Sequence, residues 1–384
     1  MGKKRLSWVA LNLALAPNSL VVRNLLERFA SPVEILAAPS EALAEVSGVT
    51  ARLLRRLKHP QLQSAAAAEI ERAKRHAVRI LLRDDPGFPG ILTQLPDPPP
   101  LLYMRGDLRE ADDPAVAVVG SRRATCYGLE MARLLAGEIA AAGVTVVSGL
   151  ARGIDQAAHA GALDAGGRTL AFLGSGIDRI YPRENLALAE RISSNGAILS
   201  EFPMGTAPLS GNFPVRNRLI SGVSRGTLVV EAAARSGSLI TARMALEQGR
   251  EVFAVPGNLT SENALGPNLL IQQGAKLVMR GRDVLEEIPG APLPPEIEEA
   301  EKPAESAEEE ILLRCLSPAD PLTLDELAGR TGLSTGPLLA ALLKLEIEER
   351  ARQLPGGRFI RKRRGQVGQI ARHRGIAGQG EDHQ

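Results

Sequence analysis

The chain has 384 residues and a formal net charge of +2, so no overall electrostatic field marks it as a nucleic-acid or membrane-surface protein, and any basic site must be local. Its apolar fraction of 44% allows two or three packed domains, while an aromatic content of only 3% argues against a broad base-stacking surface. The two cysteines, Cys126 and Cys315, exclude a disulfide framework and are typical of a cytoplasmic protein.

Residues 1–77 are expected to form a small helical domain. A basic start followed by an apolar run over residues 6–16 is shaped like a signal peptide. Ser7 and Asn12 interrupt the apolar run, however, and favour a first buried helix of the domain. No run in the chain reaches the roughly 18 apolar residues that a membrane-spanning helix needs, so we expect no membrane association.

A later part of this domain resembles a helix-hairpin-helix element. Residues 46–51 form a turn around Gly48, and Arg52 and Arg55 follow it. Such a turn binds a DNA phosphate through backbone N–H groups, helped by nearby cations. Thr50 stands where the pattern has a second glycine, so a helical packing unit with a solvated basic face is an equal alternative.

The central domain is expected to span residues 78–288. Its first part, up to Pro114, is proline-rich and irregular except for Leu101–Gly106, which has the pattern of a strand and turn. We interpret this part as an extension that packs on the edge of a main sheet.

Four short apolar runs, each leading into a cluster of glycine and serine, organise the rest of the central domain. The runs are Ala115–Val119, Val144–Val147, Leu170–Leu173 and Thr227–Val230, with alanine-rich segments of helical length between them. This alternation predicts a parallel sheet covered on both faces, because doubly covered strands are continuous runs of Val, Leu and Ile. The expected fold is therefore α/β, an extended Rossmann-like, doubly wound, mostly parallel sheet.

The glycine and serine clusters mark the expected binding site. In a parallel sheet, ligands sit beyond the carboxyl ends of the strands, which is where these clusters fall. Glycine lets the backbone approach a ligand, and the N-terminus of each following helix presents free N–H groups that suit a phosphate. We therefore expect an anionic ligand several phosphates long, held also by Arg122, Arg152, Arg179 and, from a loop before the strand at residues 227–230, by Arg216 and Arg218.

Motifs of several enzyme classes are incomplete in this chain. The sequence at residues 174–176 begins like a dinucleotide fingerprint, but Arg179 occupies the position of the third glycine, which disfavours a nicotinamide cofactor. The G-x-S-x-G match at residues 222–226 precedes a strand, whereas a nucleophile elbow follows one. There is no P-loop, and the scattered histidines and cysteines form no ligand pattern, so we expect no metal and no cofactor.

Three side chains near the clusters are candidates for acid–base chemistry. Asp155 and His159 lie one helical turn apart and face the same way. An aspartate in a first helical turn is more often a capping or dipole residue, and we favour that interpretation. Glu231, at the end of a strand, is either an acid that orients arginines or a base.

The C-terminal part predicts a winged helix. Residues 289–308 are dominated by proline and glutamate and are expected to be a linker. Within residues 309–361, three short helices are expected, followed by a hairpin in the place of a wing. The pattern is Glu309–Leu316, Leu324–Arg330 and Thr335–Ile347 for the helices, with Pro355-Gly356-Gly357 as the hairpin turn.

The reading helix of this winged helix is poorly equipped for DNA. It carries Lys344 but also Glu346, so DNA binding and a protein-binding or structural role remain open alternatives. Residues 362–384 form a basic tail, either a disordered cationic arm or a solubilising segment.

Seven blocks of the chain carry a family resemblance. In order they are AVVGSR at 117–122, SGLARGIDQAAH at 148–159, LGSGIDRIYP at 173–182, SEFP at 200–203, FPVRNR at 213–218, SGSLITA at 236–242 and VPG at 255–257. Together they resemble the signature blocks of the DNA-processing protein A family (DprA, also called Smf). Several long blocks in the right order are far more specific than a single motif. The resemblance covers about residues 80–285.

The resemblance implies a cytoplasmic, non-enzymatic protein that binds single-stranded DNA, forms a homodimer and loads the RecA recombinase in natural transformation and DNA recombination. It also implies that Arg122 and the basic loop from Phe213 to Arg218 contribute to the DNA pocket. With the glycine and serine clusters, the residues expected to bind DNA are Gly120, Ser121, Arg122, Ser148, Gly149, Arg152, Gly153, Gly174, Ser175, Gly176, Phe213, Arg216, Asn217, Arg218, Ser236, Gly237 and Ser238.

The main alternative is an enzyme similar to the nucleotide phosphoribohydrolases, which use a related sheet and a G-T-x-x-E turn. Gly226-Thr227 followed by Glu231 resembles that turn loosely, although Ser224-Arg225 replace the double glycine before it. A third hypothesis is a scaffold that binds partners through its end domains.

Overall fold

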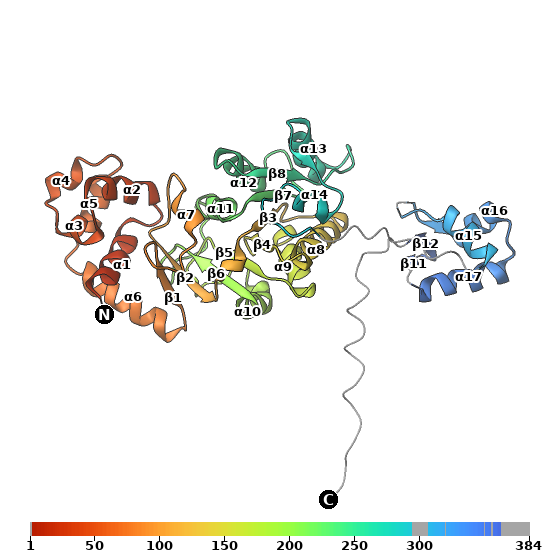
Figure 1. Cartoon of the computed structure of the whole chain (residues 1–384), viewed down its shortest axis with the longest axis horizontal. Helices are drawn as coiled ribbons and strands as arrows, with labels where there is room; N and C mark the ends of the chain where they lie inside the picture. The colour runs from red at the N-terminus through yellow and green to blue at the C-terminus, as the bar shows by residue number, and fades with distance from the viewer. Residues whose placement is uncertain (1, 294–305, 319, 349, 355, 362–384) are drawn as a thin grey trace, which may run out of the picture. The chain divides into compact units, whose positions relative to one another are not determined.

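The computed structural model describes residues 2–293, 306–318, 320–348, 350–354 and 356–361. The chain divides into two compact units, Met1–Pro294 and Pro295–Gln384 (Figure 1). Most of the predicted linker at residues 289–308 and all of the predicted basic tail at 362–384 lie outside the described residues.

Six helices make up the N-terminal part of the larger unit. They are α1 (Lys3–Leu15), α2 (Ser19–Arg28), α3 (Pro32–Ala37), α4 (Ser40–Ala44), α5 (Ala51–Leu57) and α6 (Leu62–Arg75). The prediction of a first buried helix is confirmed, because Trp8, Leu11 and Leu15 of α1 are buried in the hydrophobic core. No helix of the described residues is both long enough and apolar enough to span a bilayer.

The turn between α4 and α5 has the geometry of a hairpin between helices. Gly48 adopts a φ of +88° and packs against Val21, and the hydroxyl of Thr50 accepts a hydrogen bond from the backbone N–H of Leu53, which caps α5. Two basic side chains that follow this turn form hydrogen bonds within the helical part. Arg56 donates to the carbonyl of Leu13, and Lys58 donates to the carbonyls of residues 36 and 38. These two side chains therefore stabilise the packing of the helices.

A sheet of nine strands forms the centre of the larger unit among the described residues. The strands are β1 (Arg79–Leu82), β2 (Leu101–Gly106), β3 (Ala115–Val119), β4 (Thr145–Ser148), β5 (Thr169–Phe172), β6 (Gly196–Ser200), β7 (Gly226–Val229), β8 (Glu251–Ala254) and β9 (Lys276–Leu277). Their order is β1-β2-β6-β5-β4-β3-β7-β8-β9, and only the β1–β2 and β2–β6 pairs are antiparallel. The predicted mostly parallel sheet, with residues 78–114 packed on its edge, is confirmed.

Helices cover both faces of the sheet (Figure 1). Val116 and Val118 of β3 pack in the core below α8 and α9, while Ala117 and Val119 face the opposite core with α11 and α12. The period of two in a strand produces this division. The remaining helices of this unit are α7 (Gly90–Thr93), α8 (Cys126–Ala141), α9 (Ile154–Asp164), α10 (Leu186–Ser194), α11 (Asn212–Val223), α12 (Gly237–Glu247), α13 (Leu265–Gln272) and α14 (Gly281–Leu285).

The chain order reverses between β3 and β7. From β3 the chain winds outward through β4, β5 and β6, and it then crosses back through α11 to β7 on the other side of β3. The loops that follow β3 and β7 therefore diverge towards opposite faces, which is the switch point where doubly wound sheets bind ligands.

A buried ionic network joins the N-terminal helices to the sheet. The Arg218 guanidinium forms an ion pair with Glu201, donates to the hydroxyl of Ser19 of α2 at 2.8 Å, and lies 2.9 Å from a carboxylate oxygen of Asp97. Arg218 and Glu201 are 5% and 2% exposed. The prediction that Arg218 lies in a loop is wrong, because it lies on α11 and is buried. Its guanidinium pairs with Glu201 and Asp97 inside the larger unit.

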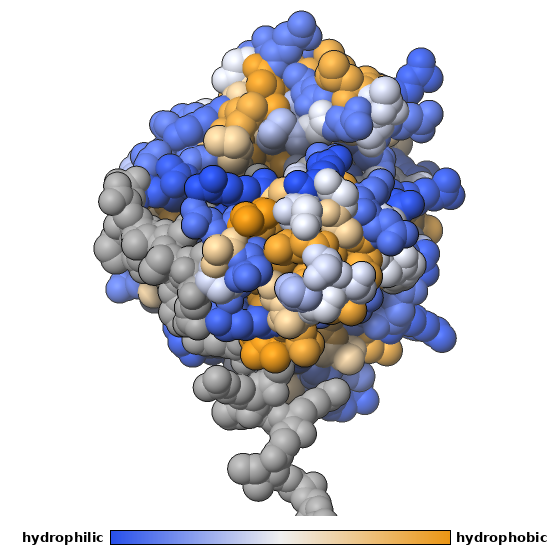
Figure 2. Space-filling view, turned by 90° about the vertical axis from the view of Figure 1, so that its right-hand side faces the viewer, coloured by the Kyte–Doolittle hydropathy of each residue, from blue (hydrophilic) through white to orange (hydrophobic). Residues whose placement is uncertain are grey.

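The smaller unit has the predicted winged-helix pattern. Its elements are α15 (Ala307–Cys315), β10 (Leu322–Thr323), α16 (Leu324–Thr331), α17 (Thr335–Ile347), β11 (Ala351–Leu354) and β12 (Arg358–Arg361), and β10 was not predicted. On α17 the side chain of Lys344 forms an ion pair with Glu309 at 2.7 Å. Apolar side chains reach the surface instead, because Leu343 and Ile347 are 59% and 74% exposed. Figure 2 shows hydrophobic patches between hydrophilic residues on the face that it views.

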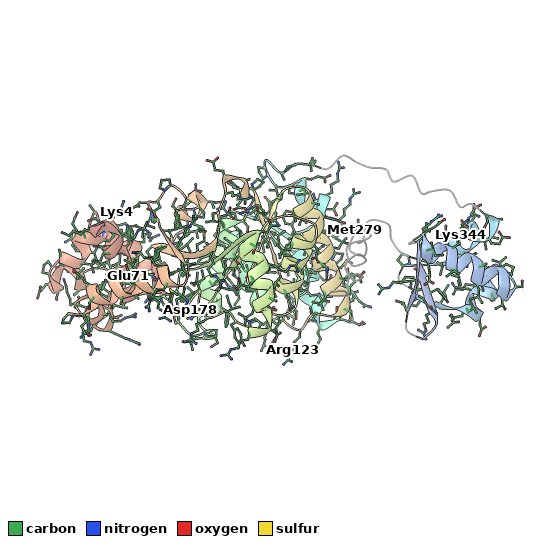
Figure 3. The ribbon with its side chains drawn as sticks, turned by 90° about the horizontal axis from the view of Figure 1, so that it is seen from below. Lys4, Glu71, Arg123, Asp178, Met279 and Lys344 are labelled. Carbon is green, nitrogen blue, oxygen red and sulfur yellow. The ribbon has the colours of Figure 1, made fainter. Side chains whose placement is uncertain are left out.

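The buried network predicts a large loss of stability when one partner is removed. Glu201→Ala leaves the buried Arg218 charge with only the partly exposed Asp97, so the free energy of unfolding should fall by about 3 kcal/mol or more in denaturant titration. Glu71→Ala is the control, because Glu71 lies on the surface of α6 (Figure 3), where its pair with Lys74 should contribute less than about 1 kcal/mol. Equal losses in the two variants would contradict the role given to the network.

Candidate nucleic-acid interface

The loop after β3 forms the first wall of the candidate site. The backbone N–H of Ser121 donates to the carbonyl of Glu231 at 2.7 Å, and its side chain accepts a hydrogen bond from the N–H of Arg123. This loop places the side chains of Arg122 and Arg123 in solvent, with Arg123 at the surface of the unit (Figure 3). The predicted Gly120, Ser121 and Arg122 thus lie at the carboxyl end of the sheet.

An aromatic and arginine cluster lies beside this loop. The Arg122 guanidinium stacks on the ring of Phe213 with 4.7 Å between the guanidinium carbon and the ring centroid, and Arg216 lies 5.9 Å from the same centroid. The ring of Tyr181 is 6.1 Å from that of Phe213 and is 44% exposed. A cavity of about 190 Å³ opens between these groups and is lined by Arg122, Arg123, Gly149, Ala151, Arg152, Tyr181, Pro182 and Phe213.

Arg216 supports this cluster from below. The structure corrects its predicted place in a loop, because it lies on α11 and is only 3% exposed. Its guanidinium donates to the carbonyls of Gly149 and Phe172, which follow β4 and end β5. Burial lowers the pKa of Arg216 to about 10, partly offset by the Asp155 carboxylate, so it remains charged at neutral pH. Arg216 therefore holds the ends of β4 and β5 together and lies next to the Phe213 ring of the cluster.

Several glycines and serines of the predicted site are packing residues. A Cβ on Gly149 would strike the Arg216 guanidinium, and one on Gly174 would lie 2.9 Å from the Phe213 ring. The hydroxyl of Ser148 donates to the carbonyl of Val118, and that of Ser175 donates to the carbonyl of Arg179. These residues are buried. Their Cα positions and hydroxyl groups therefore pack against, or hold, neighbouring parts of the chain, and their role as phosphate donors stays a prediction.

The other predicted main-chain donors are partly engaged. The N–H of Gly149 donates to the Asp155 carboxylate and that of Gly176 donates to the carbonyl of Thr206. No helix begins directly after residues 174–176, since α10 starts at Leu186. By contrast, Gly153 comes directly before α9 and directly after the exposed Arg152. Among these predicted residues, the exposed Arg122 and Arg152 therefore lie in the loops that follow β3 and β4.

The start of α12 lies next to Asn217. The Ser236 side chain caps α12 by accepting the N–H of Ser238, whose hydroxyl lies 2.6 Å from that of Ser236. The amide of Asn217 donates to the carbonyl of Gly237 at 3.5 Å, and its oxygen accepts a hydrogen bond from Arg216. Asn217 thus links the supporting Arg216 to this helix start, where Gly237 is exposed.

Asp155 and His159 do not form an acid–base pair at the site. The Asp155 carboxylate accepts the N–H groups of Gly149 and Ala151 and thereby shapes the loop before α9, as the capping interpretation predicts. Burial raises the pKa of the Asp155 carboxyl, and the Arg216 guanidinium opposes that shift. His159 is fully buried, 2.7 Å from the hydroxyl of Thr169, and burial lowers its pKa to about 3.

Glu231 joins the two loops of the switch point. Its carboxylate accepts hydrogen bonds from the N–H of Thr125, at 2.9 Å, and from the Thr125 hydroxyl. Gly128 on α8 lies so close that a Cβ there would strike the carboxylate. Glu231 is 5% exposed, and among the contacts of the described residues its carboxylate pairs with no arginine. It orders the loop after β3 because its carboxylate holds Thr125 and its backbone carbonyl holds the N–H of Ser121.

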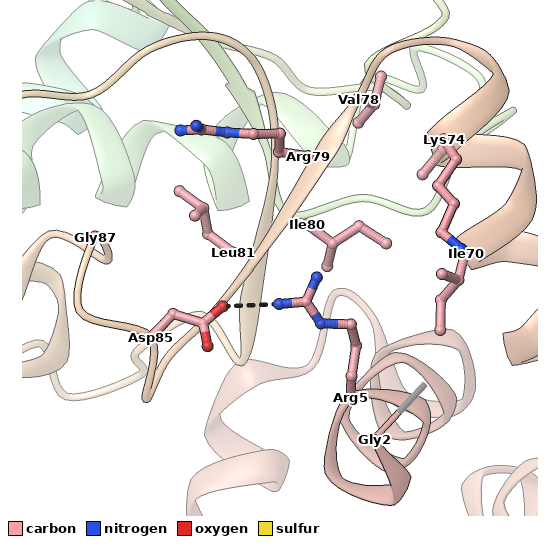
Figure 4. Close-up of a pocket in the computed structure, with 11 residues that line it drawn as sticks. Gly2, Arg5, Ile70, Lys74, Val78, Arg79, Ile80, Leu81, Asp85 and Gly87 are labelled. Atoms are coloured by element: carbon pink, nitrogen blue, oxygen red, sulfur yellow. Dashed lines mark hydrogen bonds and ion pairs between the residues drawn. The ribbon is translucent and has the colours of Figure 1, made fainter.

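A larger cavity of about 710 Å³ lies between α1, α6 and β1 (Figure 4). Arg5 on its wall pairs with Asp85 at 3.3 Å, and most of the lining is apolar. It is far from the carboxyl ends of the parallel strands, so the smaller cavity remains the candidate site. The described residues contain no group of three or more His, Cys, Asp or Glu side chains that would hold a metal ion.

Sequence reasoning missed two members of the site. Arg123 follows Arg122 and lines the cavity, and Glu184 forms two hydrogen bonds to the Arg152 guanidinium at 2.7 and 2.9 Å. The sequence does signal Arg123, because two consecutive arginines follow a strand end. Nothing in the sequence signals Glu184, because its pairing with Arg152 depends on the fold of the loop after Pro182.

Two family models match the chain. The model of DNA recombination-mediator protein A matches residues 79–289, and that of the DprA winged helix domain matches residues 295–357. The chain belongs to the DprA/Smf family. This assignment agrees with the sheet, the switch-point site and the winged helix, and it confirms the resemblance seen in the sequence.

Individual relatives support the family assignment. The chain is 35% identical to protein Smf of Synechocystis sp. over 88% of this chain and 95% of the relative. It is 42% identical to protein Smf of Escherichia coli over 73% and 76% of the two chains. The X-ray structure of DprA from Streptococcus pneumoniae is similar with a TM-score of 0.66 and 35% identity, covering 75% of this chain and 99% of that one.

The burial of His159 predicts an acid-sensitive stability. The unfolded imidazole binds a proton below a pKa of about 6.5, whereas the folded one stays neutral down to about 3. The contribution of the neutral His159 imidazole to the free energy of unfolding is therefore fully present above about pH 6.5 and is lost as the pH falls towards 3. In denaturant titrations across this window, His159→Gln should show a smaller loss of stability on acidification than the unmodified protein. Parallel curves would contradict the neutral, buried imidazole.

Proposed function

We propose that the protein binds single-stranded DNA in the cavity at the carboxyl ends of β3, β4 and β5. The observation that carries this proposal is that exposed arginines and an exposed aromatic ring line one small cavity at a switch point. Guanidinium groups neutralise backbone phosphates, and aromatic rings stack on unpaired bases. The cavity admits a base or a phosphate but is too small for a duplex.

Tyr181 is the better stacking surface of the two aromatic residues. One face of Phe213 is occupied by the Arg122 guanidinium, whereas Tyr181 is 44% exposed at the mouth of the cavity. A base stacked there would contribute about 1–3 kcal/mol, and the arginines would hold the phosphates on either side. Phe213 then acts mainly by fixing the orientation of Arg122.

The family model supports a wider role in recombination. Its description as a recombination mediator fits a protein that loads the RecA recombinase onto single strands, acting as a homodimer and without a catalytic step. The nucleotide phosphoribohydrolase alternative is not favoured, because the carboxylate of Glu231 is engaged by Thr125 and does not line the arginine cavity. The apolar exposed residues of α17 favour a protein partner over DNA for the winged helix.

Removal of Arg122 should weaken binding to single strands. Arg122→Ala should lower the affinity for oligo-dT and make the slope of log affinity against log salt shallower by about 0.7, the value of one neutralised phosphate. Fluorescence anisotropy titrations at several salt concentrations measure both. Arg225→Ala is the matched control, since Arg225 pairs with Asp113 at the amino end of the sheet. An unchanged affinity and slope for Arg122→Ala would refute the cavity as the binding site.

Loss of Glu184 should strengthen binding. Glu184 occupies the Arg152 guanidinium that a phosphate would use, and both side chains are more than half exposed, so the pair is weak and displaceable. Glu184→Gln should therefore raise the affinity for oligo-dT about two- to fivefold. Glu190→Gln removes a similar pair, in which both carboxylate oxygens of Glu190 accept hydrogen bonds from Arg105 on β2, and it should leave the affinity for oligo-dT unchanged. The same gain in both variants would show a general charge effect instead.

A further inference from the structure

A second cavity lies at the same edge of the sheet, beyond the ends of β7 and β8. Its volume is about 390 Å³, and its lining includes Thr125, Tyr127, Glu231, Asn258 and Ser261. The proposed single-strand site uses none of these residues. Val255 and Ala264 form an apolar part of its wall and are 3% and 5% exposed, while the ring of Tyr127 is 47% exposed.

The two cavities lie on either side of the switch point. The segment from Ser121 to Thr125 separates them: Arg122 and Arg123 line the first cavity, and Thr125 lines the second. Strands in a sheet are about 4.8 Å apart, so the ends of β4 and β8, three neighbours apart, are separated by roughly 14 Å. Stacked nucleotides advance about 3.4 Å each, so about four nucleotides bridge the cavities, or fewer if the strand is extended.

The connecting segment is rigid and basic. Glu231 holds the N–H and the hydroxyl of Thr125, and the side chain of Asn263 donates to the carbonyl of Arg123 at 2.9 Å. Both loops that border the second cavity are thereby fastened to the loop that carries the arginines. A strand leaving the first cavity would pass the exposed side chains of Arg122 and Arg123 before it reaches the second.

The chemistry of the second cavity suits a base better than a phosphate. The Tyr127 hydroxyl donates to the carbonyl of Pro256 at 3.1 Å, which fixes the ring at the mouth of the cavity. The buried Glu231 carboxylate in the wall disfavours a phosphate, whereas the lone pairs that Thr125 leaves unused suit an exocyclic amine of cytosine, adenine or guanine. The exposed ring offers a stacking face that every base can use.

We propose that this cavity is a second base-binding subsite for the same DNA strand, and that Tyr127 stacks a base a few nucleotides away from the one at Tyr181. The proposal rests on the proposed single-strand function. In this arrangement the carboxyl edge of the sheet binds the strand at two bases, one at Tyr181 and one at Tyr127, and Arg122 and Arg123 hold the phosphates between them. Only oligonucleotides long enough to span both cavities gain from the second anchor.

The test compares short and long oligonucleotides. Affinities for oligo-dC dinucleotides and octanucleotides are measured at low salt with the full chain, for the unmodified protein, Tyr127→Ala, Tyr127→Phe and the cavity-filling Ser261→Leu. Tyr127→Ala and Ser261→Leu should lower the affinity for the octanucleotide about fivefold or more, the effect of one stacked base, and leave dinucleotide binding unchanged. Tyr127→Phe retains the ring and should bind nearly as well as the unmodified protein. Leu129→Ala, an exposed position elsewhere on α8, is the control.

The outcomes separate this inference from the function on which it rests. If the unmodified protein binds no oligonucleotide, the proposed function fails. If it binds the octanucleotide and both Tyr127→Ala and Ser261→Leu bind equally well, only the second subsite is overturned. An equal loss for dinucleotide and octanucleotide also overturns it, because that pattern indicates a change in the fold and not a lost anchor.

Discussion

The candidate site depends on one buried guanidinium. Arg216 reaches from α11 under the carboxyl ends of β4 and β5, donates to two main-chain carbonyls, and lies against the ring of Phe213. A buried charge persists only where it is hydrogen-bonded, and the carbonyls at strand ends supply that compensation. The ring that Arg216 supports in turn orients Arg122, the side chain that faces solvent. The buried Arg216 and the exposed Arg122 share one aromatic ring.

The sequence predicted well the parallel strands that carry this site. The four apolar runs became β3, β4, β5 and β7 because strands buried on both faces leave an unmistakable pattern. The position of the site followed from the parallel topology, since glycine and serine clusters after such strands must meet at one edge. The strands β1, β6, β8 and β9 were not predicted: β1 and β8 begin with the charged residues Arg79 and Glu251, β9 has only two residues, and the alanine and glycine of β6 lack a clear β pattern.

The individual roles within the site were harder to predict. A sequence does not show which of several arginines is buried, so Arg216 and Arg218 were placed beside Arg122 in a binding loop although one supports the site and the other holds Glu201. The same holds for Gly149 and Gly174, where the close approach of the Arg216 and Phe213 side chains leaves no room for a Cβ. Burial and long-range pairing decide these roles, and both arise only when segments far apart in the sequence meet. The capping role of Asp155 was predictable because it is local.

The most direct test of the account is to locate the bound strand on the protein. Oligonucleotides that carry a photoreactive base can be crosslinked to the full chain at low occupancy, and the modified peptides identified by mass spectrometry. The account predicts crosslinks to the loop around Tyr181 and the start of α11, both at the carboxyl edge of the sheet. Crosslinks confined to the hairpin between α4 and α5 or to the winged helix would contradict it, because the DNA would then bind a surface that the sheet does not form.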